Sequence, residues 1–345
     1  MTMDLFTPIL STPKQHWIFR MLLQDRYAPE RQVLSSWADG FRDRDGKFVH
    51  EFQSTFESSL WELYLHAATK IWGFQLDQAP ASPDFIVKAP IPLCIEAAIA
   101  APAKDGKPAF GYDASDIPDD FNQFNAAASI RICNSFTAKV KRYRDYYAKL
   151  PHVTNRPFVL AIAAFDRPLA HFAAGRSVIA AIFGLYHDED ATPHDADKVV
   201  SYNVSAAAKS ATVDVPMGMF CEPTYPEVSA VIYSSLATWG KIRALADDPS
   251  AKTIYQTFHR KEGDLRPEVR SALKKNYSEH LLDGLHILHN PFARFPIPNG
   301  TFSHPRLAET RVAPDGELLT EAPDDFLLVR TLCSVQKDED GGAAA

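Results

Sequence analysis

Apolar side chains recur at helical spacing along residues 51–72 of this chain. They stand at positions 56, 60, 63, 64, 67, 68, 71 and 72, a spacing that places them on one face of a helix. Gly73 follows the last of them, and a glycine at that place commonly ends a helix. The pattern therefore predicts an amphipathic helix over 51–72.

Three apolar runs of strand length come next, at 74–76, 85–87 and 93–100. A proline-containing turn separates the second run from the third, and we expect these two to form a hairpin-like pair. Residues 101–121 are rich in Pro, Gly and Asp and are typical of a long irregular loop. Such loops are uncommon in compact domains and are often functional.

A second helical pattern covers 122–150 and ends at Pro151, and the nearly continuous apolar run 157–165 follows it. A run of this kind is typical of a buried central strand, and the helix before it would provide the crossover to a parallel neighbour. The order of helix, three strands, helix and strand predicts an α/β fold with a mixed central sheet flanked by helices.

This core divides the chain into parts. We expect an N-terminal extension over 1–50, the core over 51–166, a C-terminal extension over 167–335 that packs on the core or continues it, and a disordered tail over 336–345. Within the C-terminal extension, 169–186 has a helical pattern and 228–235 has the pattern of a further strand.

Composition narrows the class of protein. The 345 residues are 46% hydrophobic and 23% charged, which is enough to bury a large core. No stretch approaches the roughly 20 apolar residues that span a bilayer, and the first residues do not resemble a signal peptide. We therefore expect a cytoplasmic protein with no membrane partner. The four cysteines form no CxxC, so the sequence indicates neither a zinc cage nor a disulfide framework.

Two carboxylates stand in apolar surroundings. Asp84 precedes the run 85–87, and Glu96 lies inside the run 93–100. A carboxylate is costly to bury unless it binds something, and two carboxylates on adjacent strands suit Mg²⁺, which takes oxygen ligands and keeps several waters. The plainer alternatives are a turn residue after Pro83 for Asp84 and an edge position in the sheet for Glu96.

The order of these elements, with PDF at 83–85 before one strand and IEA at 95–97 within the next, resembles the PD-(D/E)xK nuclease superfamily. Segments beginning at residues 60, 131, 150 and 288 are also similar to a bacterial group within it. The resemblance implies a restriction-endonuclease-like αβββαβ core and a nuclease dependent on Mg²⁺ or Mn²⁺, with Asp84 and Glu96 as metal ligands. It implies a nucleic-acid substrate, DNA rather than RNA, and it allows a homodimer.

The superfamily's lysine normally stands two residues after the second acid, where this chain has Ala98. The helix over 122–150 offers a replacement, because one of its faces carries Arg131, Ser135, Lys139 and Arg142 opposite the apolar Ile132, Phe136, Val140 and Tyr143. The resemblance implies that Lys139 is the migrated catalytic lysine and that Arg131 or Arg142, beside Ser135, contacts phosphate. A solvated helix face is the simpler alternative.

The helix over 51–72 offers two further acids for the site. Glu57 falls within the apolar arc, where an unpaired carboxylate would be costly, whereas the resemblance favours Glu62 from its distance to Gly73. Both stay candidates. The formal net charge of −7 argues against a surface covered by nucleic acid, although 139–144 and 259–275 are basic. The alternative function is a catalytically inactive module on the same fold that binds nucleic acid or protein.

Overall fold

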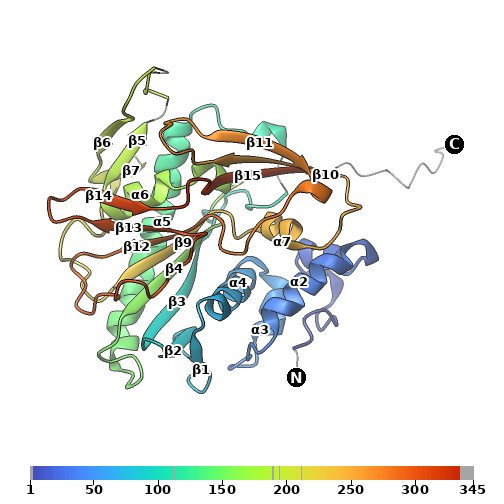
Figure 1. Ribbon diagram of the computed structural model, residues 1–345. Coiled ribbons are helices and arrows are strands. Elements are labelled where there is room, and N and C mark those ends of the chain that lie inside the picture. Colours follow the sequence, from blue (N-terminus) through green and yellow to red (C-terminus); the bar gives the residue numbers. More distant parts are fainter. Residues whose placement is uncertain (1–2, 112, 189, 194, 211, 335–345) are drawn as a thin grey trace.

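A mixed eight-stranded sheet organises the chain in the computed structural model (Figure 1). The structure describes residues 3–334 except 112, 189, 194 and 211, so the tail predicted over 336–345 lies outside the described residues. The strand order is β1-β2-β3-β4-β9-β12-β13-β14. The neighbours β3 and β4 are parallel, as are β4 and β9, whereas β2 pairs antiparallel with β3. The predicted α/β fold with a mixed central sheet is confirmed.

The helices of the described residues are α1 (Trp17–Leu22), α2 (Ala28–Ala38), α3 (Phe48–Ser54), α4 (Glu57–Ile71), α5 (Phe121–Asp145), α6 (Arg176–Phe183) and α7 (Trp239–Leu245). The strands of the large sheet are β1 (Gln75–Asp77), β2 (Phe85–Ala89), β3 (Leu93–Ala100), β4 (Phe158–Ala164), β9 (Ala230–Ser234), β12 (Leu285–His289), β13 (Ala308–Val312) and β14 (Leu318–Glu321). The run α4, β1, β2, β3, α5, β4 is the element order expected from the sequence.

Two hydrophobic cores lie on the two faces of the sheet, and Figure 1 shows α2, α3 and α4 gathered on one side with α5 and α6 on the other. Residues of β4 alternate between the cores, with Val159 facing α4 and Leu160 facing α5. The indole N–H of Trp61 in α4 donates to the Ala161 carbonyl of β4 at 2.9 Å. The sheet is therefore covered on both faces, which explains the continuous apolar run in β4.

The single helix predicted over 51–72 is wrong in one respect, because it is broken into α3 and α4 at Thr55 and Phe56. Phe52 and Phe56 are both fully buried. The ring of Phe52 packs edge-on against Phe19 of α1, and the ring of Phe56 stacks on His16. The break lets both rings enter the core beside the N-terminal helices, a tertiary contact that local periodicity does not register.

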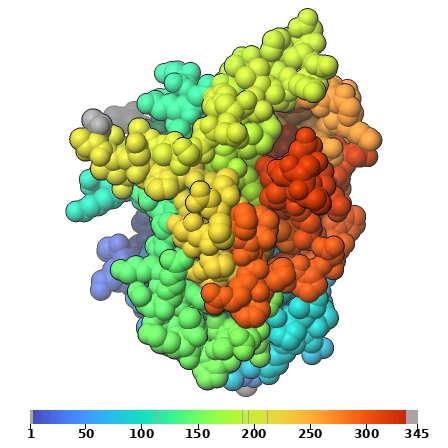
Figure 2. Space-filling view, turned by 90° about the vertical axis from the view of Figure 1, so that its left-hand side faces the viewer, coloured from blue at the N-terminus to red at the C-terminus, as the bar shows by residue number. Residues whose placement is uncertain are grey.

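The C-terminal extension continues the core, because β9, β12, β13 and β14 extend the large sheet beyond β4. It also forms smaller sheets. These comprise β10 (Thr253–His259), β11 (Glu268–Leu273) and β15 (Leu327–Ser334) in one sheet, and the pairs β5 (Leu185–Asp188) with β6 (Val200–Asn203) and β7 (Ala206–Ser210) with β8 (Val213–Pro216). Figure 2 shows the yellow-green to yellow segments that contain these two pairs projecting from the body of the molecule.

The long irregular loop predicted after β3 is present between β3 and α5, with a short 3-10 turn at Ala114–Asp116. No helix among the described residues is long and apolar enough to cross a membrane.

Candidate active site

A cavity of about 470 Å³ opens where α3, α4, the start of β2, the end of β3 and the middle of α5 meet. Three carboxylates line it, those of Glu51, Glu62 and Asp84. The helix α5 contributes Arg131, Asn134, Ser135 and Lys139 to the opposite wall. The cavity therefore has an acidic side and a polar, basic side.

Asp84 immediately precedes β2, and hydrogen bonds hold both its carboxylate and the backbone of its segment. Its Oδ2 accepts a hydrogen bond of 2.7 Å from the backbone N–H of Ala97 in β3. The segment before β2 is held by Arg44, whose guanidinium donates to the backbone carbonyls of Pro80, Pro83 and Asp84 itself. Asp84 therefore lies just before β2, the strand beside β3, and its carboxylate reaches the backbone of β3 next to Glu96.

Glu96 lies in the middle of β3 and its side chain is only 3% exposed. Its Oε1 accepts from the Lys139 amine at 2.6 Å and from the Tyr147 hydroxyl at 2.9 Å. Tyr147 in turn accepts from the Nε–H of Arg142 at 2.6 Å. The second carboxylate oxygen, Oε2, is buried and has no hydrogen-bond partner. A buried unpaired carboxylate oxygen is costly, so Oε2 fits a ligand atom that a bound cation would satisfy.

The small side chain of Ala98 leaves room beside Glu96 for a lysine that comes from a helix. Side chains two residues apart on a strand point to the same face, so Ala98 faces α5 together with Glu96. Both Ala98 and Lys139 line the cavity. The methyl group of Ala98 leaves space that a larger side chain at this strand position would fill. Lys139 extends into that space from the facing helix α5. Its side chain is 29% exposed.

The carboxylates of the cavity disfavour one another's ionisation. Burial, followed by repulsion from Glu96, raises the pKa of Asp84 to about 7, although Lys139 opposes the shift. Burial also raises the pKa of Glu62 well above its ordinary value, with further contributions from Asp84, Glu51 and Glu96. Acids held together against their repulsion are typical of functional sites, and a cation between them would relieve that repulsion.

The donor set suits Mg²⁺ or Mn²⁺ better than a softer metal, because the groups at the cavity are carboxylate and backbone oxygens. Within the described part of the chain, no three or more His, Cys, Asp or Glu side chains are grouped as a metal-binding cluster. An ion held by Asp84 and Glu96 would complete its coordination with water, which is how Mg²⁺ is commonly bound in proteins.

Two of the residues predicted for the site lie elsewhere. Glu57 does not line the cavity. It stands in the first turn of α4, 3.4 Å from Nε2 of His16, which explains a polar residue in the apolar arc. Arg142 also lies outside the cavity lining, with its guanidinium over the ring of Tyr147 at 5.2 Å. Its place in the hydrogen-bond chain to Glu96 indicates a positioning role rather than a phosphate contact.

The other predicted residues come together around the cavity. Arg131 lines it while donating to the carbonyls of Ala101 and Pro102. Ser135 lines it and donates to the Ile99 carbonyl at 3.2 Å. Both therefore anchor the end of β3 and the start of the loop that follows, besides facing the cavity.

Three residues at the site were not expected from the sequence, Arg44, Glu51 and Tyr147. Arg44 belongs to the predicted N-terminal extension, and only the fold brings it to the site. Glu51 is the first residue of the helix predicted over 51–72 and was not singled out there. Tyr147 reads in the sequence as an aromatic residue for packing. Tyr147 follows the basic face of the helix and lies one turn beyond Tyr143. The neighbouring sequence does not indicate that its hydroxyl reaches Glu96.

Asp84→Asn should stabilise the protein at pH 8. The pKa of Asp84 is about 7 in the folded chain against 3.8 ordinarily, so the unfolded chain loses this proton first. Stability therefore falls as pH rises from about 4 to about 7 and stays reduced above that. Asparagine keeps an acceptor for the Ala97 N–H and removes the charge. We expect a gain on the order of 2 kcal/mol at pH 8, and none at pH 4, in urea denaturation with EDTA. Equal stability at pH 8 would contradict this.

Comparison of the chain with protein-family models, with curated proteins and with solved structures finds no match.

Proposed function

We propose that this chain is a nuclease dependent on Mg²⁺ or Mn²⁺, of the PD-(D/E)xK superfamily, with its lysine supplied by α5. The observation that carries the proposal is the ion pair between Lys139 and Glu96 beside a cavity lined by Asp84. These residues are far apart in the sequence, and they are the residues to which the resemblance gives metal-binding and catalytic roles. Ala98, in the lysine's usual position, faces the same space.

The roles of the residues follow from their positions. Asp84 and the Oε2 of Glu96 would hold the metal ion, which when bound polarises the phosphate and lowers the pKa of a water molecule. Lys139 is placed to donate to that water or to a phosphate oxygen, once its hydrogen bond to Glu96 loosens. Tyr147, which is held by Arg142, donates to Oε1 of Glu96. This hydrogen bond fixes the carboxylate and would leave Oε2 for the metal ion. Glu62 and Glu51 complete the acidic wall.

A nucleic-acid substrate is supported by the charges on the other wall. Arg131 and Lys139 line the cavity from α5. Cationic side chains at the wall of a cavity suit a phosphate backbone, even though the whole chain is acidic. The proposed substrate is DNA in preference to RNA.

Cleavage assays test the proposal. Purified protein is incubated with supercoiled plasmid DNA, with single-stranded DNA and with RNA, each in Mg²⁺, in Mn²⁺ and in EDTA. We expect phosphodiester cleavage of DNA in either metal and none in EDTA. Separately, Mn²⁺ should raise the melting temperature of the wild-type protein, because an ion that binds only the folded chain stabilises it.

The same experiment decides between the nuclease and the catalytically inactive module. Binding of nucleic acid in gel-shift assays that is unchanged by EDTA, without cleavage of any substrate and without a melting-temperature shift in Mn²⁺, would favour the binding module and overturn the nuclease.

A further inference from the structure

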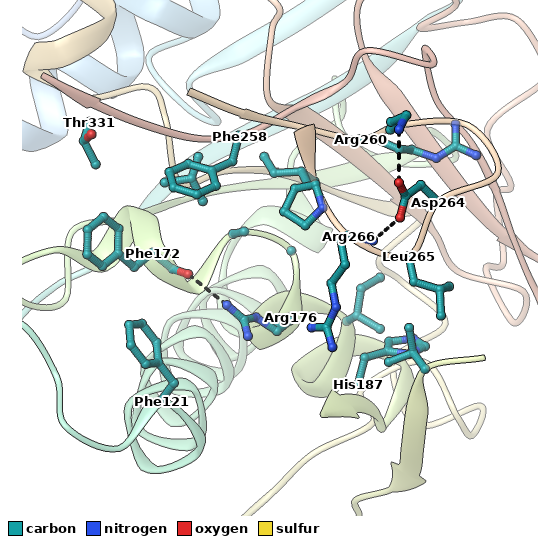
Figure 3. Close-up of a pocket in the computed structure, with 18 of the residues that line it drawn as sticks. Phe121, Phe172, Arg176, His187, Phe258, Arg260, Asp264, Leu265, Arg266 and Thr331 are labelled. Carbon is teal, nitrogen blue, oxygen red and sulfur yellow. Dashed lines mark hydrogen bonds and ion pairs between the residues drawn. The ribbon is translucent and has the colours of Figure 1, made fainter. Parts of the chain in front are cut away.

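A second cavity, of about 560 Å³, lies in the C-terminal extension (Figure 3). It is enclosed by the start of α5, by the 3-10 turn Ala170–Ala173 with the start of α6, by β10 and β15, and by the connection from β10 to β11. Its size falls within the range of roughly 300 to 1,000 Å³ that is typical of small-molecule sites.

Aromatic rings form one part of its wall. Phe121, Phe172 and Phe258 all line it and all are half-buried. Phe121 and Phe172 lie 6.4 Å apart between ring centroids, tilted by 31°, and they pack on a small hydrophobic cluster of Phe124, Ala128 and Ala173. The rings are therefore supported from behind while part of each faces the cavity. Figure 3 shows the three rings toward one end of the site.

Cations form another part. Arg176, Arg260, Lys261 and Arg266 line the cavity, and Asp264 is the one acid among the described residues of the lining. Asp264 is paired with Lys261 at 3.1 Å. This is a local positive excess in a chain with a formal net charge of −7. The guanidinium of Arg266 is anchored by a hydrogen bond of 3.0 Å to the Thr192 carbonyl. Figure 3 places Arg260 and Arg266 away from the Phe121 and Phe172 rings, with Arg176 between.

We propose that this cavity binds a nucleotide, with the base stacked on the phenylalanine rings and the phosphate held by the arginines. Bases stack on aromatic side chains regardless of sequence, and the guanidinium fork matches phosphate oxygens. A nucleotide joins a planar base to an anionic phosphate. The base matches the aromatic part of the wall, and the phosphate matches the cationic part. Among the described residues that line the cavity, Asp264 is the one carboxylate, so its repulsion of a phosphate is small.

The cavity is separate from the candidate active site. Phe121 and Lys139 belong to the same helix, and a rise of about 1.5 Å per residue separates them by roughly 27 Å. The nucleotide is therefore either a free molecule or one nucleotide of a bound strand at a distance from the carboxylates. The proposal stands whether or not those carboxylates cleave nucleic acid.

Calorimetric titration tests it, with EDTA present so that metal-dependent events are absent. The probes are the four nucleoside 5′-monophosphates, adenosine alone, inorganic phosphate alone and a single-stranded DNA 12-mer. We expect a monophosphate or the oligonucleotide to bind, with adenosine and phosphate about tenfold weaker or more. Tighter binding of a monophosphate than of the oligonucleotide assigns the site to a free nucleotide, and binding of the oligonucleotide alone assigns it to a strand.

Two variants locate the binding. Phe172→Leu keeps an apolar side chain on the hydrophobic cluster but removes the ring, and Arg176→Gln removes a charge from a half-buried position. Each should weaken binding about tenfold, while Arg20→Gln, at an exposed position of α1, should leave it unchanged. Circular dichroism establishes that each variant is folded, and Arg176→Gln remains as the test if Phe172→Leu is not. Absence of binding by every probe, or unchanged binding in the folded variants, would overturn the proposal.

Discussion

Glu96→Gln is expected to reduce metal-dependent DNA cleavage by about three orders of magnitude. The metal supplies several kcal/mol of transition-state stabilisation, and each 1.36 kcal/mol lost costs about a factor of ten in rate. Glutamine can keep an acceptor oxygen for Tyr147, which now donates to Oε1 at 2.9 Å. The variant should therefore fold while losing the negative charge on the second oxygen. Initial rates of plasmid nicking in Mg²⁺ measure the loss.

A metal-binding readout separates this role from a purely structural one. The melting-temperature rise of the wild-type protein in Mn²⁺ should disappear in Glu96→Gln. Glu57→Gln is the matched control, because Glu57 is a half-buried acid that contacts His16 outside the cavity, and it should keep both the cleavage rate and the Mn²⁺ effect. Wild-type cleavage by Glu96→Gln would show that Glu96 is not a metal ligand.

Lys139→Met should lower kcat by about two orders of magnitude, which is the usual cost of removing one donor aimed at developing negative charge. Methionine preserves much of the length of the side chain, and the partly exposed position of Lys139 tolerates the change. The loss should appear in kcat rather than in binding of DNA. Single-turnover cleavage with saturating protein measures it, and gel shifts in Ca²⁺ measure the binding.

The migrated position can be tested by moving the lysine back. Ala98 faces the same space as Lys139, so the double variant Ala98→Lys with Lys139→Met places an amine on β3 two residues after Glu96. We expect it to recover at least about tenfold of the lost rate. Lys141→Met, at an exposed position of the same helix, should cleave as the wild type does. A Lys139→Met protein with normal kcat would remove Lys139 from the chemistry.

The sequence predicted the central elements well because buried elements carry apolar residues at the spacing of a helix or a strand. Strand β4 is buried on both faces and reads as a continuous apolar run, and α5 packs Ile132, Phe136 and Val140 on the sheet, as its three- and four-residue spacing predicted. The split between α3 and α4 was missed because both sides of the break are apolar and helical in pattern. What breaks the helix is packing of Phe52 and Phe56 beside α1.

The candidate site divides in the same way. Asp84 and Glu96 were expected from residue type and order together with the resemblance, whereas the roles of Lys139 and Glu62 were implied by the resemblance. Glu57 was proposed because an unpaired carboxylate in an apolar arc is costly, and the structure provides its partner in His16. That partner comes from the N-terminal extension, so no argument confined to the helix could identify it. Arg44 reaches the site in the same way, because it belongs to the N-terminal extension and lies outside the recognised pattern.

The order of elements, the two carboxylates on neighbouring strands and the basic stripe on α5 were determined by the sequence itself, because strand and helix periodicities dictate which side chains share a face. The tertiary structure decided which of these faces meet. It pairs Lys139 with Glu96, so that Oε1 of Glu96 has two donors and Oε2 has none. It also brings Phe172 and Arg266 to the wall of the second cavity. Periodicity orients a side chain relative to its own element, whereas distances between elements depend on how the whole core packs.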